Sequence, residues 1–121
     1  MTNEFVPMDL ALKLKALGFK ERVLTYYEDG KPKLHTAIEG WDFNSSFLNC
    51  VSRPIYSQAF DWFRQNYPYR FYVLPCSQHE KYLFEITLPS SIFYTSSEDE
   101  AYNTYKEARQ HCLEKLIEII K

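Results

Sequence analysis

The sequence predicts an α+β fold: one two-layer domain over residues 1–121, in the order α-β-β-α-β-β-α, with helices packed on one face of an antiparallel sheet. Three observations support this class. An aromatic helical pattern at Pro54–Asn66 leads directly into strand patterns at Arg70–Leu74 and Tyr82–Leu88, and Ala101–Lys121 is strongly amphipathic. Segregated strand pairs and helices bury one face of a sheet in this way, and 121 residues suit a single domain.

The first predicted element is a helix at Met8–Leu17. Leu10, Leu14 and Leu17 recur at helical spacing. Gly18 is expected to end the helix, because glycine adopts the left-handed conformation without a steric penalty.

A β-hairpin is expected next. Arg22–Glu28 is rich in β-branched and aromatic residues, and Asp29-Gly30 is a strong signal for a two-residue hairpin turn. Lys33–Ile38 is the predicted second strand. The following segment, Glu39–Arg53, has no clean period, and a short strand near Phe47–Val51 is the only element expected in it.

The central helix is predicted to start at Pro54, with Ser52 nearby as an N-cap, and to end before Pro68. Its expected apolar face contains Tyr56, Ala59, Phe60, Phe63 and Tyr67. Two strands follow. Tyr82–Leu88 alternates cleanly, and the short connection Pro75–Lys81 predicts antiparallel pairing with Arg70–Leu74.

The last element is a long amphipathic helix. Thr95, Ser96 and Ser97 are its N-cap candidates. The predicted buried stripe contains Ala101, Tyr105, Ala108, Cys112, Leu116 and Ile119, widened by Tyr102, Leu113, Ile117 and Ile120.

Composition limits the class of protein. The net charge is −2 and no dense Lys/Arg cluster is visible, so bulk charge does not favour nucleic-acid binding. Cys50, Cys76 and Cys112 are widely spaced and odd in number, which favours free thiols in a reducing compartment. No signal-peptide pattern or membrane-length apolar run is present, so we expect a soluble, cytoplasmic protein.

Catalytic and metal-binding motifs are not evident, so we predict no catalytic, cofactor-binding or metal residues. Cys76 and His79 have a ligand-like spacing, and His111 with Cys112 would complete a zinc set, but adjacent helical residues point about 100° apart. A spatial Cys–His pair in an enzyme stays open as the third hypothesis.

Aromatic residues are unusually numerous, at 21 of 121, and eight fall between Tyr56 and Tyr72. One helix face and one sheet face cannot bury them all, and such residues are enriched at protein interfaces. We therefore predict an interaction surface that contains Trp41, Phe43, Trp62 and Tyr72. An aromatic-rich core is the alternative. A stacking platform for nucleic acid, with Arg53, Arg64 and Arg70 nearby, is a further one.

Two motifs carry a resemblance over about the C-terminal two-thirds of the chain: P-x-Y-x-x-A-x-x-W-F-R from Pro54 to Arg64, and T-Y-x-E-A-…-C-L-x-K-L-I-x-I from Thr104 to Ile119. With these motifs the chain resembles small uncharacterised proteins encoded by bacterial phages and mobile elements. The resemblance implies a small accessory or binding protein and transfers no site residues. We therefore expect a protein-interaction module that contacts a protein partner or a second copy of itself, with nucleic-acid binding as the alternative and an enzyme less favoured.

Overall fold

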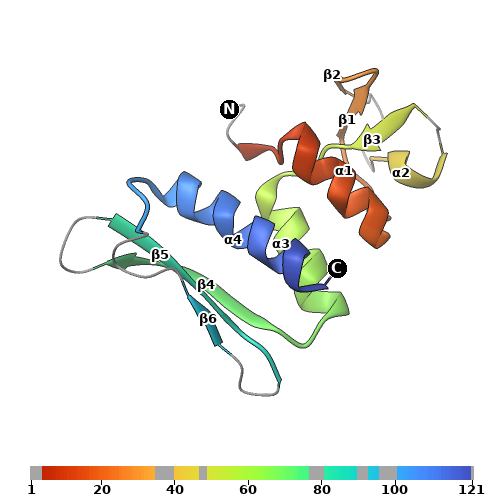
Figure 1. The fold of residues 1–121 in the computed structure, drawn as a ribbon. Coiled ribbons are helices and arrows are strands. Elements are labelled where there is room, and N and C mark those ends of the chain that lie inside the picture. The colour runs from red at the N-terminus through yellow and green to blue at the C-terminus, as the bar shows by residue number, and fades with distance from the viewer. Residues whose placement is uncertain are drawn as a thin grey trace. The chain divides into compact units, whose positions relative to one another are not determined.

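The computed structural model describes residues 4–34, 40–46, 49–76, 81–89, 93–95 and 101–120 (Figure 1). The elements follow in the order α1 (Met8–Leu17), β1 (Thr25–Glu28), β2 (Lys31–Leu34), α2 (Phe43–Ser46), β3 (Cys50–Ser52), α3 (Tyr56–Asn66), β4 (Arg70–Cys76), β5 (Lys81–Thr87), β6 (Phe93–Thr95) and α4 (Tyr105–Ile120). This content confirms the predicted α+β class.

The strands form two sheets rather than the predicted single one. Each has three antiparallel strands, in the orders β2-β1-β3 and β4-β5-β6. The β1–β2 hairpin does not add its strands to the sheet of β4 and β5, because the free edge of β1 pairs with β3 instead. Correspondingly, β6, which the sequence did not predict, pairs with β5.

The chain divides into two compact units, Met1–Trp62 and Phe63–Lys121. We call them the N-terminal unit and the C-terminal unit. The boundary falls inside α3, so one continuous helix belongs to both. A single domain over residues 1–121 stays a prediction, because units joined in this way are compatible with one folding domain or with two.

The first hairpin of the N-terminal unit forms as predicted. Glu28 pairs with Lys31, and the two residues between them, Asp29 and Gly30, have φ values of 52° and 81°. Positive φ at both positions is the signature of the type I′ turn that Asp-Gly favours. The second strand ends at Leu34, and the rest of the predicted strand, up to Ile38, lies outside the described residues.

Helix α1 has the predicted bounds and the predicted glycine end. Gly18 has a φ of 96°, its N–H donates to the Lys15 carbonyl, and the Phe19 N–H donates to the Leu14 carbonyl. This pair of bonds is a Schellman motif, which satisfies carbonyls at the end of the helix. The motif turns Phe19 into the core, where it is fully buried.

The segment between the first hairpin and α3 contains structure that the sequence prediction missed. Asn44, in the one-turn helix α2, joins two distant stretches: its amide donates to the Phe19 carbonyl at 2.9 Å and accepts from the Ser52 N–H at 2.8 Å. The strand expected near Phe47–Val51 is present as β3, shifted toward the C-terminus. The Asn44 side chain therefore ties this irregular segment to both of these stretches.

Helix α3 starts at Tyr56, two residues later than predicted. Ile55 pairs with Phe5 in an isolated bridge, and its N–H donates to the Gln58 side chain at 3.1 Å. The expected N-cap, Ser52, instead ends β3. The predicted apolar face is confirmed for four of its members, since Tyr56, Ala59, Phe60 and Phe63 are all buried.

The C-terminal unit is a long hairpin with one helix across it. β4 and β5 pair over seven residues each, from Arg70↔Thr87 to Cys76↔Lys81, and α4 lies over one face of the sheet (Figure 1). Phe71, Phe84 and Ile86 are buried, and the register places them on the same face of the sheet. The predicted antiparallel pairing of these strands is confirmed.

Helix α4 begins at Tyr105, not at Ala101. Tyr102 exchanges two backbone hydrogen bonds with Tyr82, which holds the chain extended before the helix. The N-cap is Thr104, whose hydroxyl accepts from the Glu107 N–H at 3.1 Å; Ser96 and Ser97 lie outside the described residues.

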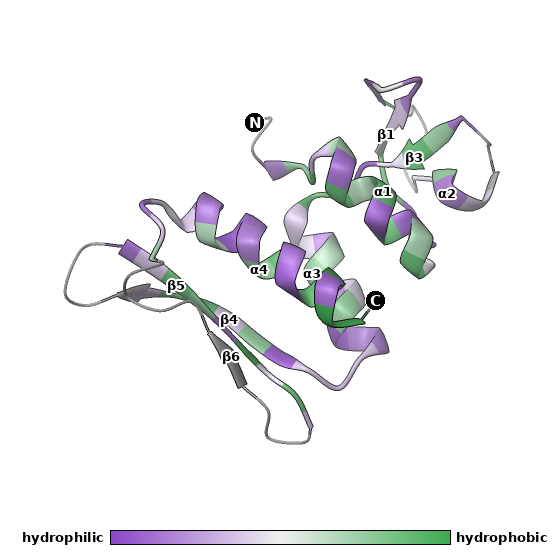
Figure 2. Cartoon of the chain, in the orientation of Figure 1, coloured by the Kyte–Doolittle hydropathy of each residue, from purple (hydrophilic) through white to green (hydrophobic). Residues whose placement is uncertain are grey.

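The amphipathic character of α4 is confirmed, with a shift of the buried stripe (Figure 2). Its buried side chains are Ala108, Arg109, Cys112, Leu113, Leu116 and Ile117. Tyr105, predicted to lie on the stripe, is exposed.

Candidate interaction surface

Trp41 is an exposed aromatic residue on a tightly constrained backbone. Its N–H donates to the Val23 carbonyl at 2.9 Å, and its carbonyl accepts from the Val23 N–H at 3.0 Å. The preceding Gly40 has a φ of 76°, and a Cβ at that position would lie 2.8 Å from the Val23 carbonyl oxygen. Glycine is therefore required for this close approach. The backbone of Trp41 is therefore fixed by its two hydrogen bonds to Val23, while 43% of the residue stays exposed.

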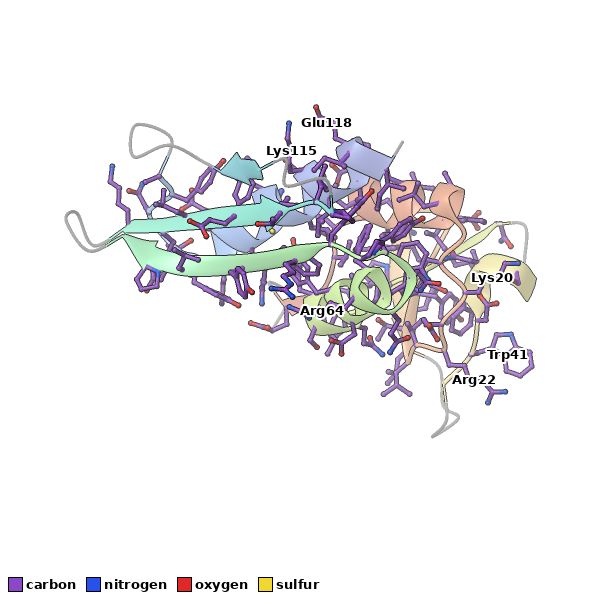
Figure 3. The ribbon with its side chains drawn as sticks, turned by 90° about the horizontal axis from the view of Figure 1, so that it is seen from below. Lys20, Arg22, Trp41, Arg64, Lys115 and Glu118 are labelled. Carbon is purple, nitrogen blue, oxygen red and sulfur yellow. The ribbon has the colours of Figure 1, made fainter. Side chains whose placement is uncertain are left out.

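The residues around Val23 supply the rest of this surface. Arg22 and Leu24 flank Val23 along the chain, and both are exposed, as is Lys20. Figure 3 shows Lys20, Trp41 and Arg22 at the same end of the N-terminal unit. We define the Trp41 surface as Trp41, Lys20 and Arg22. The Trp41 surface combines the apolar indole with two cations. Glu21, which lies between Lys20 and Arg22 in the sequence, is also exposed.

Phe43 does not belong to this surface, so its predicted exposure is wrong. Its N–H donates to the Ser52 hydroxyl at 3.1 Å, and its ring stacks on Tyr26 with centroids 4.1 Å apart. Asp42 accepts from the Ser45 N–H, which starts the short turn of α2. As a result Phe43 is only 2% exposed.

Trp62 is also a core residue, against the prediction. It is 6% exposed, and its ring contacts Phe19 edge to face at 5.7 Å. The helical spacing placed Trp62 off the main apolar face of α3, but Phe19, turned inward by the end of α1, covers it. Phe19 is distant in sequence, so periodicity within one helix could not reveal the contact.

Tyr72 is exposed as predicted, at 55%, but it belongs to the C-terminal unit. It lies on β4 and pairs with Glu85 of β5. Its neighbour Phe71 points to the opposite face, where it is buried beneath the Arg64 guanidinium, which lies 4.5 Å from the ring centre. Trp41 and Tyr72 thus belong to different units.

The two described thiols are poor nucleophiles. Burial raises the pKa of Cys112 to about 12, although the positive charge of Arg64 acts in the opposite direction. Burial, followed by the negative charge of Glu28 3.8 Å away, raises the pKa of Cys50. A raised pKa keeps a thiol protonated, whereas the nucleophile is the thiolate.

His111 and Cys112 point to different environments, as the helical register predicted. His111 is exposed, stacks on Tyr102 with centroids 4.4 Å apart, and lies 3.2 Å from a Glu114 carboxylate oxygen. Cys112 is fully buried. Within the described ranges, no group of three His, Cys, Asp or Glu residues is arranged to hold a metal ion. His79 lies outside the described residues, so the Cys76–His79 spacing stays untested.

Comparisons with protein-family models, with curated proteins and with solved structures found no match. In the part of the chain that the structure describes, no helix has the length and apolar character needed to cross a membrane.

Sequence reasoning identified Trp41 but missed what holds it. That reasoning assigned Gly40 no role. The useful signal was the Gly-Trp pair itself, because a glycine beside an exposed aromatic residue can mark a close backbone approach. Val23, the residue approached, lies 17 positions before Gly40 and 18 before Trp41, so no local pattern links them.

Proposed function

We propose that this chain is a small accessory protein of phage or mobile-element type that acts through protein–protein contact, with the Trp41 surface as its anchor. The observation that carries the proposal is the constrained display of Trp41. Tryptophan is enriched among the residues that dominate binding energy at interfaces. A side chain on a backbone already held by two hydrogen bonds and a required glycine loses less freedom on binding.

The cysteine chemistry supports a binding role over the alternative of a thiol enzyme. Both described thiols are buried and have raised pKa values, so each is protonated near neutral pH. The family resemblance of the α3 and α4 motifs also favours an accessory protein.

The test is capture of partners by the full chain from its host during phage infection, followed by titration calorimetry of each purified pair. Three bait proteins are compared: wild type, Trp41→Ala, and Leu12→Ala, a control of similar exposure at 47% on α1 of the same unit. We expect a partner whose affinity falls about 30-fold or more with Trp41→Ala and stays unchanged with Leu12→Ala. Light scattering of the wild type shows whether that partner is a second copy.

Equal binding by all three proteins would remove Trp41 as the anchor. A partner lost only with Leu12→Ala would place the interface on α1 instead.

Single-stranded nucleic acid is a second candidate ligand, favoured by Lys20 and Arg22 at the same end of the N-terminal unit as the Trp41 indole. Bases stack on aromatic side chains, and the backbone contacts cations. Binding of a fluorescent oligothymidylate that weakens steeply with salt, and that Lys20→Gln and Arg22→Gln each reduce, would support it. Binding independent of salt would exclude this mode.

A further inference from the structure

A groove of about 320 Å³ lies at one end of the β4–β5 hairpin in the C-terminal unit. Its lining residues are Pro68, Arg70, Thr87, Leu88 and Pro89. Arg70 and Thr87 are directly paired across the two strands, while Pro68 precedes β4 and Pro89 follows β5. Proline has a fixed φ, so the two walls are stiff. We call this the Arg70 groove.

Arg70 gives the groove its charge. The side chain is exposed, and no hydrogen bond, ion pair or ring contact joins it to another described residue. This distinguishes it from Arg64, which covers the Phe71 ring, and from Arg53, which covers the Phe5 ring at 4.1 Å. The Arg70 guanidinium therefore keeps its full set of donors, and the Thr87 hydroxyl lines the same groove.

The groove continues onto a sheet face that carries Tyr72. Residues two apart on a strand share a face, so Arg70 and Tyr72 lie on one side, about 6.6 Å apart along β4. The opposite side carries Phe71, Phe84 and Ile86 and packs against α4. One face of the sheet thus carries a cation, Arg70, beside the Thr87 hydroxyl. The exposed ring of Tyr72 follows two residues later, at the spacing of alternate residues in an extended chain.

We propose that the Arg70 groove and Tyr72 bind an extended segment of a partner protein. The segment carries a carboxylate side chain over Arg70 and Thr87, and an apolar side chain two positions away over Tyr72. Arginine and carboxylate form a forked pair of hydrogen bonds with defined geometry. Extended peptides present alternate side chains to one face, and their repeat matches the distance from Arg70 to Tyr72.

The charges on this face favour an acidic peptide over a nucleic acid. Arg70 is the cation that lines the groove, and Glu85 lies directly across from Tyr72. A nucleic-acid strand would bring a phosphate close to Glu85 for each base stacked on Tyr72, and single-strand sites normally provide a basic track. A peptide with one carboxylate brings a single negative charge to this face and places it over Arg70, one alternate position away from Glu85. The groove and the Trp41 surface share no residue, so each proposal is tested with its own variants.

The test is an NMR titration of the ¹⁵N-labelled full chain with the capped peptide acetyl-Gly-Ser-Asp-Ser-Phe-Ser-Gly-amide. We expect the amide shifts to change at Arg70, Tyr72, Thr87 and Leu88. Replacing the aspartate of the peptide with asparagine should weaken binding about tenfold or more, because the forked charge pair is lost. Arg70→Gln should have the same effect on the protein side, while Lys13→Gln, an exposed charge removal on α1, should leave the affinity unchanged.

Three results would overturn the proposal. One is the absence of shift changes at millimolar peptide with a wild-type spectrum that is well dispersed. Another is equal binding of the aspartate and asparagine peptides. The third is stronger binding of an octathymidylate at the same amides, which would assign the groove to nucleic acid.

Discussion

The N-terminal and C-terminal units each contain a three-stranded antiparallel sheet, but different interactions hold the two sheets in place. In the N-terminal unit the strands have three or four residues, and β2 is exposed along its whole length. Side-chain hydrogen bonds from β1 to distant segments of the chain add to this pairing: Tyr27 donates to the Val6 carbonyl, and Thr25 donates to the Arg53 carbonyl. In the C-terminal unit two seven-residue strands pair continuously under a 16-residue helix.

This difference shows where sequence patterns carry information. A regular hairpin and an amphipathic helix repeat the same local rule over many residues, so each position supports the next. The contacts of Asn44 are different, because no repeating pattern in the sequence indicates which residues are its partners.

The largest expected contrast between the units is in the reactivity of their buried cysteines. A pKa of about 12 for Cys112 leaves about a thousandfold less thiolate at pH 8 than the usual value of 9.0. The Cys50 thiol contacts the polar side chains of Glu28 and Asn49, and Asn49 is exposed to solvent. We expect N-ethylmaleimide to modify Cys50 well before Cys112, as measured by peptide mass mapping against time.

The same pKa shift predicts a pH dependence of stability. The folded chain keeps the Cys112 proton that the unfolded chain loses above pH 9, so this contribution is complete below pH 9 and is lost as the pH rises from 9 toward 12. Cys112→Ala should reduce the fall in stability between pH 8 and pH 10. Rapid modification of Cys112 in the native protein would show that the C-terminal core is more open than its burial indicates.

The two tryptophans provide the next contrast, within the N-terminal unit. Trp62→Ala removes a buried ring in edge-to-face contact with Phe19 and should cost about 3–5 kcal/mol. Trp41→Ala acts at the surface and should cost no more than about 1 kcal/mol. Urea unfolding followed by far-UV circular dichroism measures both, since it does not depend on tryptophan fluorescence. Equal losses of unfolding free energy would contradict the assignment of Trp62 to the core and of Trp41 to the surface.

The dependence of the N-terminal unit on single side chains is tested at Asn44. Asn44→Ala leaves the Phe19 carbonyl and the Ser52 N–H without this partner, which should cost about 1–3 kcal/mol. Asn44→Asp keeps an acceptor for Ser52 but places a carboxylate oxygen against the Phe19 carbonyl, so its loss should be at least as large as that of Asn44→Ala. The free energy of unfolding from urea titration gives the order, and an Asn44→Ala protein as stable as the wild type would contradict the bridging role.

A smaller effect than at Asn44 is expected at the N-cap of α4 in the C-terminal unit. Thr104→Ala removes the acceptor for the Glu107 N–H and should cost about 1 kcal/mol. Thr104→Ser retains the hydroxyl and should recover most of it. Thermal unfolding of the two variants measures the difference. If Thr104→Ala lowered the free energy of unfolding more than Asn44→Ala, our comparison of the units would be wrong. Long-range side-chain contacts would then matter no more in the N-terminal unit than local contacts do in the C-terminal unit.

Much of the fold was predictable where local chemistry repeats or is unambiguous. The bounds of α1, the Asp29-Gly30 turn, the pairing of β4 with β5 and the burial of Cys112 all follow from spacing or turn chemistry. The candidate surface was predictable only in part. Trp41 and Tyr72 are exposed, whereas Phe43 and Trp62 are buried by Tyr26 and Phe19.

The sequence by itself determined the class of the fold and most of its regular elements, because helical and strand periods and turn residues act over a few neighbouring positions. Only the tertiary structure decided that the strands form two sheets, that α4 begins after the Tyr82–Tyr102 pair, and which aromatic rings are covered. These outcomes depend on contacts between residues far apart in the chain. Such contacts are set by backbone hydrogen bonds and by the space left after packing, neither of which leaves a periodic signal.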